Sequence, residues 1–419
     1  MVRIKLLGIV ASCLVTISAC GGTTAATSNH TSPSVATPSK PATFAYVALP
    51  GSSEFGLGGY GARQAIAYAS DGNLFYATSS ISDQLYIVSP AGQVTTVAGP
   101  QGAKISALTS DGQGGFTIAQ SDSSIGSISG GGGQTISEFR LLHPYSALNG
   151  VSLGAHSLSS VTTWATEIDY TDGTGQHIAG SRIIAYTGTN TGQSINEFAL
   201  PSGVTPYDIA MGSDGNQWFA DSGSPTNPYS NIVKITPRGT MTSYPVPSPD
   251  EQPTVVTEGA DGNIWFLDVN EKTEAWAIGR VTPSGSLKEF PIPVPHGAPA
   301  MLLTDLAQGA DGRMWVSEIN TDVPYITGVH NVSLLGGNLI AVAEDSGTPQ
   351  FISVTKPGVT FVEPFALTAD ASGDISFLAA TAAAPFIGTY GPTAVVSGAV
   401  TPPPVITPPG QPGNGVSGN

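Results

Sequence analysis

One ten-residue pattern recurs along this chain and restricts its possible folds more than any other feature. The best-preserved copies read GSDGNQWFAD at 212–221, GADGNIWFLD at 259–268 and GADGRMWVSE at 309–318, with a more divergent ASDGNLFYAT at 69–78. Each copy joins an Asp-Gly turn to an aromatic residue, and aromatic residues recur at the matching place roughly every 40 to 60 residues. Seven repeated units are therefore predicted, and their aligned aromatic residues are Phe75, Phe116, Trp164, Trp218, Trp265, Trp315 and Phe377.

Each well-preserved unit contains four short segments with the composition of β-strands. In the fifth unit these segments read PTVVTEG, NIWFLD, AIGRVTP and SLKEFPIP. The Gly of the Asp-Gly turn tolerates positive φ, and nothing between the two ends of the chain shows convincing helical periodicity. The pattern predicts an all-β fold, a seven-bladed β-propeller with four-stranded blades over residues 42–400. The repeated Trp or Phe is expected to pack one blade on the next.

A ring of blades needs its first and last blades joined. The segment TFAYVALP at 43–50 resembles a fourth strand, yet it precedes the first unit. We therefore expect the N-terminal strand to close the ring by completing blade seven beside PFIGTYG at 385–391, which removes two free sheet edges. The alternative is that TAVVSGAV at 393–400 is the fourth strand of that blade.

The two ends of the chain differ in composition from the repeats. Residues 1–19 combine basic Arg3 and Lys5 with an apolar run too short to span a bilayer, which is typical of a secretory signal. The run ends at ISAC, which resembles a bacterial lipobox in which Cys20 is diacylated; the alternative is a free thiol after an ordinary signal. Residues 20–41 are predicted to be a flexible tether and 401–419 a disordered Pro/Gly-rich tail.

Charge and cysteine content narrow the possible partners and location. The chain has 30 acidic and 14 basic residues, a net charge of −16, so it would be repelled by nucleic acid and by anionic lipid. The only other Cys, Cys13, lies in the signal, so the mature chain forms no internal disulfide. The prediction is an exported lipoprotein of the bacterial cell envelope, at the outer membrane or cell surface, whose membrane link is the lipid on Cys20.

The segment GADGNIWFLD…AIGRVTPSGSLKEFPIP at 259–293 resembles a blade of the streptogramin lyases, also called virginiamycin B lyases. The likeness is strongest in units four and five and weakest in units three and seven. It implies a seven-bladed ring and, as activity, the metal-dependent opening of a cyclic depsipeptide by elimination at its ester linkage. The motif identifies the propeller type better than the activity, because one fold supports many functions.

The resemblance also implies where a lyase would carry its base, a histidine in a PHGI-like stretch eleven residues before the blade Trp. The matching residues here are Tyr207, Thr254 and Thr304. None is His, and neither Thr nor Tyr readily replaces imidazole as a base near neutral pH. His296 stands in a similar VPHGAP, but it precedes Trp315 by nineteen residues and is out of register.

The family's metal-binding Glu follows the Trp by three residues, in a WFTE-like stretch, and Glu318 matches it. Symmetry would direct such acids toward one face, where neighbouring ones could offer oxygen ligands to Mg²⁺ or Ca²⁺. The alternative is that each acid accepts hydrogen bonds within its own or a neighbouring blade. The acids at this position in four consecutive units are Glu167, Asp221, Asp268 and Glu318.

Other catalytic groups have weaker support. His330 lies in the insertion at 319–337 and is the remaining acid–base candidate, with a solvated loop histidine as the alternative. Asp208 and Asp305, near the start of inner strands, would suit the central channel of a calcium-dependent lactonase or simply cap turns. No nucleophile elbow or HExxH motif occurs.

Three functions follow from these observations. The favoured one is a lipid-anchored ring that binds a small ligand or another envelope protein on one face, without chemistry. The alternatives are a metal-dependent lyase or lactonase-like hydrolase, and a mainly structural part of the envelope.

Overall fold

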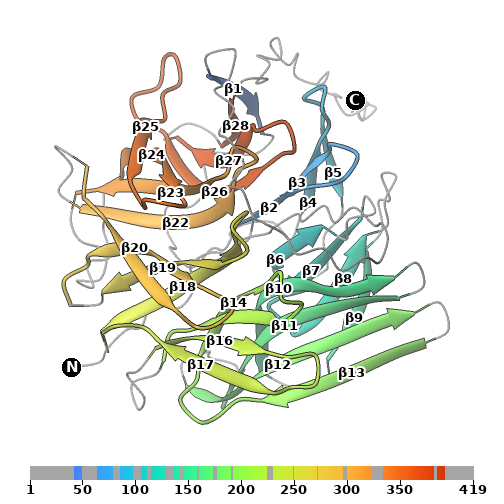
Figure 1. Ribbon diagram of the computed structural model, residues 1–419. Coiled ribbons are helices and arrows are strands. Elements are labelled where there is room, and N and C mark those ends of the chain that lie inside the picture. The colour runs from blue at the N-terminus through green and yellow to red at the C-terminus, as the bar shows by residue number, and fades with distance from the viewer. Residues whose placement is uncertain are drawn as a thin grey trace, which may run out of the picture.

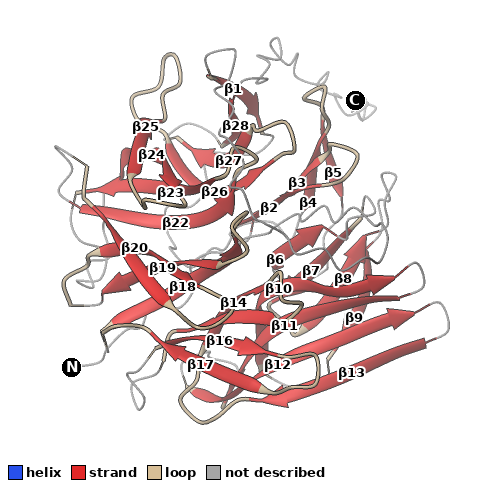
Figure 2. Ribbon diagram, in the orientation of Figure 1, coloured by secondary structure: helices blue, strands red, loops and turns tan. Residues whose placement is uncertain are grey.

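The computed structural model of the chain is an all-β ring (Figure 1), and the described residues form no helix (Figure 2). No helix long and apolar enough to cross a membrane occurs in this described part. The described residues are 42–49, 64–78, 85–97, 105–110, 115–128, 136–141, 143, 145–157, 160–172, 177–189, 192–223, 230–248, 250–270, 272–295, 300–322, 334–381 and 385–391.

The strands form seven antiparallel sheets of four, which confirms the predicted number of blades and of strands in each. Blade one contains β2 (Gln64–Tyr68), β3 (Leu74–Thr78), β4 (Leu85–Val88) and β5 (Val94–Val97). Blade two contains β6 (Ile105–Ser110), β7 (Phe116–Gln120), β8 (Ser124–Ile128) and β9 (Ile136–Arg140). Blade three contains β10 (Ser146–Ser157), β11 (Ser160–Tyr170), β12 (Ile178–Thr189) and β13 (Gly192–Ala199). Blade four contains β14 (Pro206–Met211), β15 (Gln217–Asp221), β16 (Asn231–Ile235) and β17 (Met241–Pro245).

The remaining three blades have the same order of strands. Blade five contains β18 (Glu251–Glu258), β19 (Ile264–Asn270), β20 (Trp276–Val281) and β21 (Leu287–Ile292). Blade six contains β22 (Ala300–Gln308), β23 (Arg313–Thr321), β24 (Leu334–Ala343) and β25 (Pro349–Ser353). Blade seven contains β26 (Glu363–Ala369), β27 (Ile375–Ala380), β28 (Phe386–Gly391) and β1 (Thr43–Ala48).

The N-terminal strand closes the ring. β1 pairs antiparallel with β28 over six residues, from Thr43 opposite Gly391 to Ala48 opposite Phe386. The first strands of successive blades lie against one another, and β26 lies against β2, which joins blade seven to blade one. The predicted pairing of the N-terminal segment with 385–391 is confirmed; residues 393–400, the alternative, lie outside the described residues.

The hydrogen bonds of blade five explain the repeated motif. Gly262 has φ +73° in the turn, a conformation that side chains rarely adopt. Asp261 Oδ1 accepts from the backbone N–H of Asn263 at 3.0 Å and from Trp265 Nε1 at 3.1 Å. A Cβ at Gly259 would lie 2.5 Å from that indole nitrogen. The same indole-to-Asp bond recurs in blades four and six, so the motif ties each turn to its Trp.

The repeated aromatic residues pack between blades, as predicted, but not all in the same direction. Trp265 belongs to a buried cluster with Leu302 and Met314 of blade six. Phe75 in blade one likewise packs toward blade two. Each Trp or Phe of blades one, three, four, five and six faces the following blade.

The alignment of Phe116 and Phe377 with this slot is wrong. Phe116 packs on blade one and Phe377 on blade six, so both face the preceding blade. Phe377 follows the turn glycine Gly373 by four residues, whereas Trp265 follows its turn glycine by three. Because side chains alternate along a strand, this one-residue difference moves the ring to the other face of the sheet.

Candidate functional site

The four predicted carboxylates all lie on the second strand of their blades and are buried. The four carboxylates have different neighbouring groups. The residues described in contact with each carboxylate come from its own blade or from an adjacent blade. The four residues are Glu167 on β11, Asp221 on β15, Asp268 on β19 and Glu318 on β23.

Asp221 is bound to its own blade. Its Oδ1 accepts backbone N–H groups of Thr205 and Gly223, each at 2.9 Å, and its Oδ2 accepts from Asn231 Nδ2 at 3.1 Å. Asn231 is its partner across the strand pair. These bonds join the start of β14, the end of β15 and the start of β16. Asp221 therefore has the structural role given above as the alternative to metal binding, that of accepting hydrogen bonds within its own blade.

Glu318, which matches the family's metal-binding Glu, is completely buried. Its Oε2 accepts from Asn338 Nδ2 at 2.6 Å, and Asn338 is again the cross-strand partner. Oε1 has no hydrogen-bond partner among the described residues. Burial raises the pKa of Glu318 to about 7, against a smaller opposing effect of the bonds from Asn338.

Glu167 lies at the centre of a polar network that the sequence did not reveal. It accepts from Ser123 Oγ at 2.7 Å and from His143 Nδ1 at 3.0 Å, and Arg182 Nε is 3.5 Å from its Oε2. Arg182 NH2 pairs with Asp169. Arg182 NH1 donates to His143 Nε2 at 2.7 Å, and because Nε2 accepts this bond, the imidazole proton lies on Nδ1. Burial raises the pKa of Glu167, while Ser123, His143 and Arg182 oppose that shift.

One residue of the network has an unusual backbone conformation, because Ser123 has φ 60°. His143 stands 24 residues before Glu167, and no sequence spacing links it to that carboxylate. Only the approach of the segment after β9 to blade three brings the two together.

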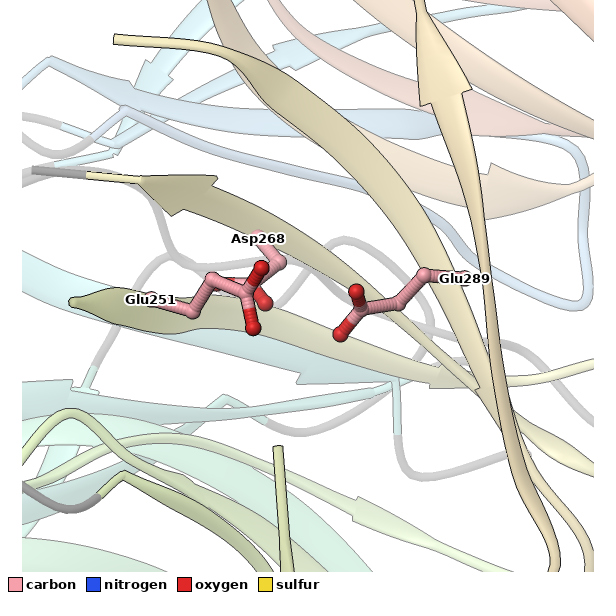
Figure 3. Close-up of side chains that lie close together, drawn as sticks. All are labelled: Glu251, Asp268 and Glu289. Carbon is pink, nitrogen blue, oxygen red and sulfur yellow. The ribbon is translucent and has the colours of Figure 1, made fainter. Parts of the chain in front are cut away.

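Asp268 differs from the other three acids. It is buried, and neither carboxylate oxygen has a hydrogen-bond partner of ordinary geometry among the described residues, although the nearby backbone N–H of Val269 opposes the rise in its pKa. Two further acids, Glu251 and Glu289, lie beside it (Figure 3). Burial is the main cause of its raised pKa, and repulsion by Glu289 and Glu251 adds to it.

The positions where the resemblance implies a base are occupied by buried side chains. Thr304 Oγ1 bonds to Ser317 Oγ at 2.7 Å and approaches the carbonyl oxygen of Pro364 at 3.3 Å. Tyr207 and Thr254 are buried as well. All three side chains carry a hydroxyl group, and none carries an imidazole.

The two inner-strand aspartates join neighbouring blades. Asp208 Oδ2 accepts from the backbone N–H of Val256 in blade five at 3.1 Å. Asp305 Oδ2 accepts from Leu367 N in blade seven at 2.9 Å, and its Oδ1 accepts from Leu306 N at 2.8 Å. Each of the two aspartates therefore links the first strand of its own blade to the first strand of the next blade.

Three of the predicted residues, Cys20, His296 and His330, lie outside the described residues. β23 extends to Thr321 and β24 begins at Leu334, so part of the predicted insertion at 319–337 is strand. The acid–base role of His330 and the lipid on Cys20 stay predictions.

The arrangement does not fit one Mg²⁺ shared around the ring. Asp221 is fully engaged by its own blade, and Glu167 is neutralised by Arg182. Glu318 keeps one buried oxygen without a partner, whereas Mg²⁺ requires near-octahedral oxygen coordination. A metal ion shared by these acids therefore supplies no chemical step in this ring.

The fold and the buried acids define a seven-bladed β-propeller with a carboxylate near the end of the second strand in four consecutive blades. The resemblance expected from the sequence is confirmed, because the sequence model of the Virginiamycin B lyase family matches residues 181–328. A comparison with curated proteins found no match.

Solved structures show the same fold. Selenomethionine-substituted virginiamycin B lyase from Staphylococcus aureus aligns with a TM-score of 0.60 at 21% identity, covering 83% of this chain and 99% of that one. A streptogramin B lyase structure gives 0.57 at 22% identity, with 84% and 97% covered. YCF48 bound to D1 peptide gives 0.54 at 12% identity, with 85% and 100% covered.

Proposed function

We propose that this propeller is a non-catalytic ring of the cell envelope that binds a small ligand or another envelope protein on one face. The observation that carries the proposal is the side chain of Thr304. It occupies the place of the implied base in the blade of Glu318, and its buried hydroxyl contacts Ser317 of its own blade and Pro364 of the next blade. A hydroxyl so placed is not a general base near neutral pH.

Two propellers with this fold support a binding role for the ring. One is YCF48, solved with a D1 peptide. The other is a catalytically inactive histidine-to-alanine variant of the Staphylococcus aureus lyase, solved with quinupristin. Binding without turnover is therefore compatible with this architecture, and a peptide-like ligand is the first class to test.

The alternative is a metal-dependent lyase, favoured by the family match over 181–328 and by the unpartnered oxygen of Glu318. A lactonase-like hydrolase is a weaker alternative, because Asp208 and Asp305 are engaged with neighbouring blades.

We expect no measurable opening of quinupristin. Loss of a general base commonly costs on the order of 10²–10⁴ in rate. The assay incubates purified protein with quinupristin and Mg²⁺ and looks for the linear product by mass spectrometry, with the Staphylococcus aureus lyase as positive control. Turnover that Glu318→Ala abolishes would overturn the non-catalytic proposal and make the lyase the function.

The envelope location is a separate part of the proposal, and it rests on the lipobox. We expect Cys20→Ala to release the protein into the soluble fraction, because stable anchoring needs the acyl chains. Mass spectrometry of the membrane-extracted wild type should find a diacylated Cys20. A Cys20→Ala protein that stays in the membrane fraction would contradict the lipid anchor but would leave the binding proposal open.

A further inference from the structure

Three acids converge inside blade five. One carboxylate oxygen from each of Glu251, Asp268 and Glu289 lies within 4.8 Å of the others. They come from β18, β19 and β21, the first, second and fourth strands of the blade, and Figure 3 shows their carboxylates directed toward one another. Asp268 is only 1% exposed, and the other two are half-buried.

The equivalent position in the neighbouring blades shows what is missing here. The cross-strand partner of the acid is Arg182 in blade three, Asn231 in blade four and Asn338 in blade six. In each case that partner is a donor close to the acid. In blade five the cross-strand partner of Asp268 is Ala277, which has no side-chain donor.

The basic residues of blade five are engaged elsewhere. Lys272 pairs with Asp250 at 2.8 Å, and Arg280 pairs with Asp261 and donates to the carbonyl oxygen of Glu344. Lys288 lies over the ring of Phe290. No ion pair between a described basic side chain and any of the three acids occurs. A buried carboxylate without a donor is costly unless it is protonated or bound to a cation.

We propose that Glu251, Asp268 and Glu289 bind a hard divalent cation, Ca²⁺, within blade five. Oxygen ligands lie about 2.3–2.6 Å from Ca²⁺, so two ligands of one ion can be up to about 5 Å apart. The three carboxylate oxygens all lie within 4.8 Å of one another. Ca²⁺ also accepts irregular coordination completed by water, whereas Mg²⁺ demands near-ideal octahedral geometry. The ion would link the outer strand of the blade to its two inner strands, whether or not the ring is catalytic.

Isothermal titration of the full-length, EDTA-treated protein with CaCl₂ tests the site. We expect one Ca²⁺ to bind per chain. Asp268→Asn and Glu289→Gln should each weaken binding at least about tenfold. Glu138→Gln is the matched control, because Glu138 is an exposed acid on the outer strand of blade two, and it should leave binding unchanged.

Two results of this titration would contradict the Ca²⁺ site. No binding up to about 10 mM Ca²⁺ would mean that the three acids only share protons. Binding that Asp268→Asn and Glu289→Gln leave unchanged would assign the ion to other acids. Circular dichroism checks that each variant folds. If Asp268→Asn does not fold, Glu289→Gln and Glu251→Gln, at half-buried positions, provide the same test.

Discussion

Replacing Trp265 with Ala is expected to lower the free energy of unfolding by about 3–5 kcal/mol, the usual cost of removing a large buried aromatic side chain. Trp265 is completely buried between blades five and six, stacks on Phe290 with ring centroids 5.7 Å apart, and donates its indole N–H to Asp261. Urea denaturation followed by far-UV circular dichroism measures the loss without relying on tryptophan fluorescence.

The chain provides its own control for this change. Blade one has Phe75 in the same slot, facing the next blade. Trp265→Phe should therefore keep the interblade contact and lose mainly the bond to Asp261, at a cost of about 1–2 kcal/mol. If Trp265→Ala and Trp265→Phe lowered the free energy of unfolding equally, the hydrogen bond to the turn, and not the packing, would be the main contribution of Trp265.

Removing β1 is expected to destabilise the ring by on the order of 5 kcal/mol and to promote aggregation. Ala45 of β1 is buried, and its neighbours Phe44 and Tyr46 pack on aromatic residues of blade seven. The Tyr46 hydroxyl also donates to the carbonyl oxygen of Thr355 in blade six. Without β1, the backbone of β28 becomes an unpaired sheet edge.

Two truncated proteins make this comparison, one beginning at residue 42 and one at residue 50. We expect the first to resemble the full-length chain in thermal unfolding and the second to unfold at a lower temperature and aggregate. A synthetic peptide of residues 42–49 should partly restore the second. If the shorter protein is as stable as the longer one, another segment, such as 393–400, takes the place of β1.

Sequence alone predicted the number of blades, their four strands and the strand that closes the ring. The reason is that these features depend on local patterns repeated many times. An Asp-Gly turn needs Gly262 at positive φ, and the Trp three residues later needs the Asp before that glycine as its acceptor. Such short-range requirements are written in the order of the residues. The position of the acids on the second strand followed from the same repeat.

What each acid does was decided by the tertiary structure. Asp221, Asp268 and Glu318 occupy equivalent places in the repeat, yet the residue across the strand pair is Asn231, Ala277 and Asn338 respectively. That residue lies on the third strand of the blade. The number of residues between it and the acid varies, because the loop joining the second and third strands differs in length from blade to blade. The sequence pattern therefore located the carboxylates but not the groups that neutralise them.

The same reason explains the network of Glu167, whereas the misaligned Phe377 reflects a shift of one position within its strand. His143 reaches Glu167 from the segment between two blades, a contact that no motif encodes. Phe377 faces blade six because it corresponds to Phe266, one residue beyond the position of Trp265, where the side chain points to the other face of the sheet. Patterns within a unit were visible in the sequence, whereas contacts between strands and blades depend on register and on loop length, which only the folded chain determines.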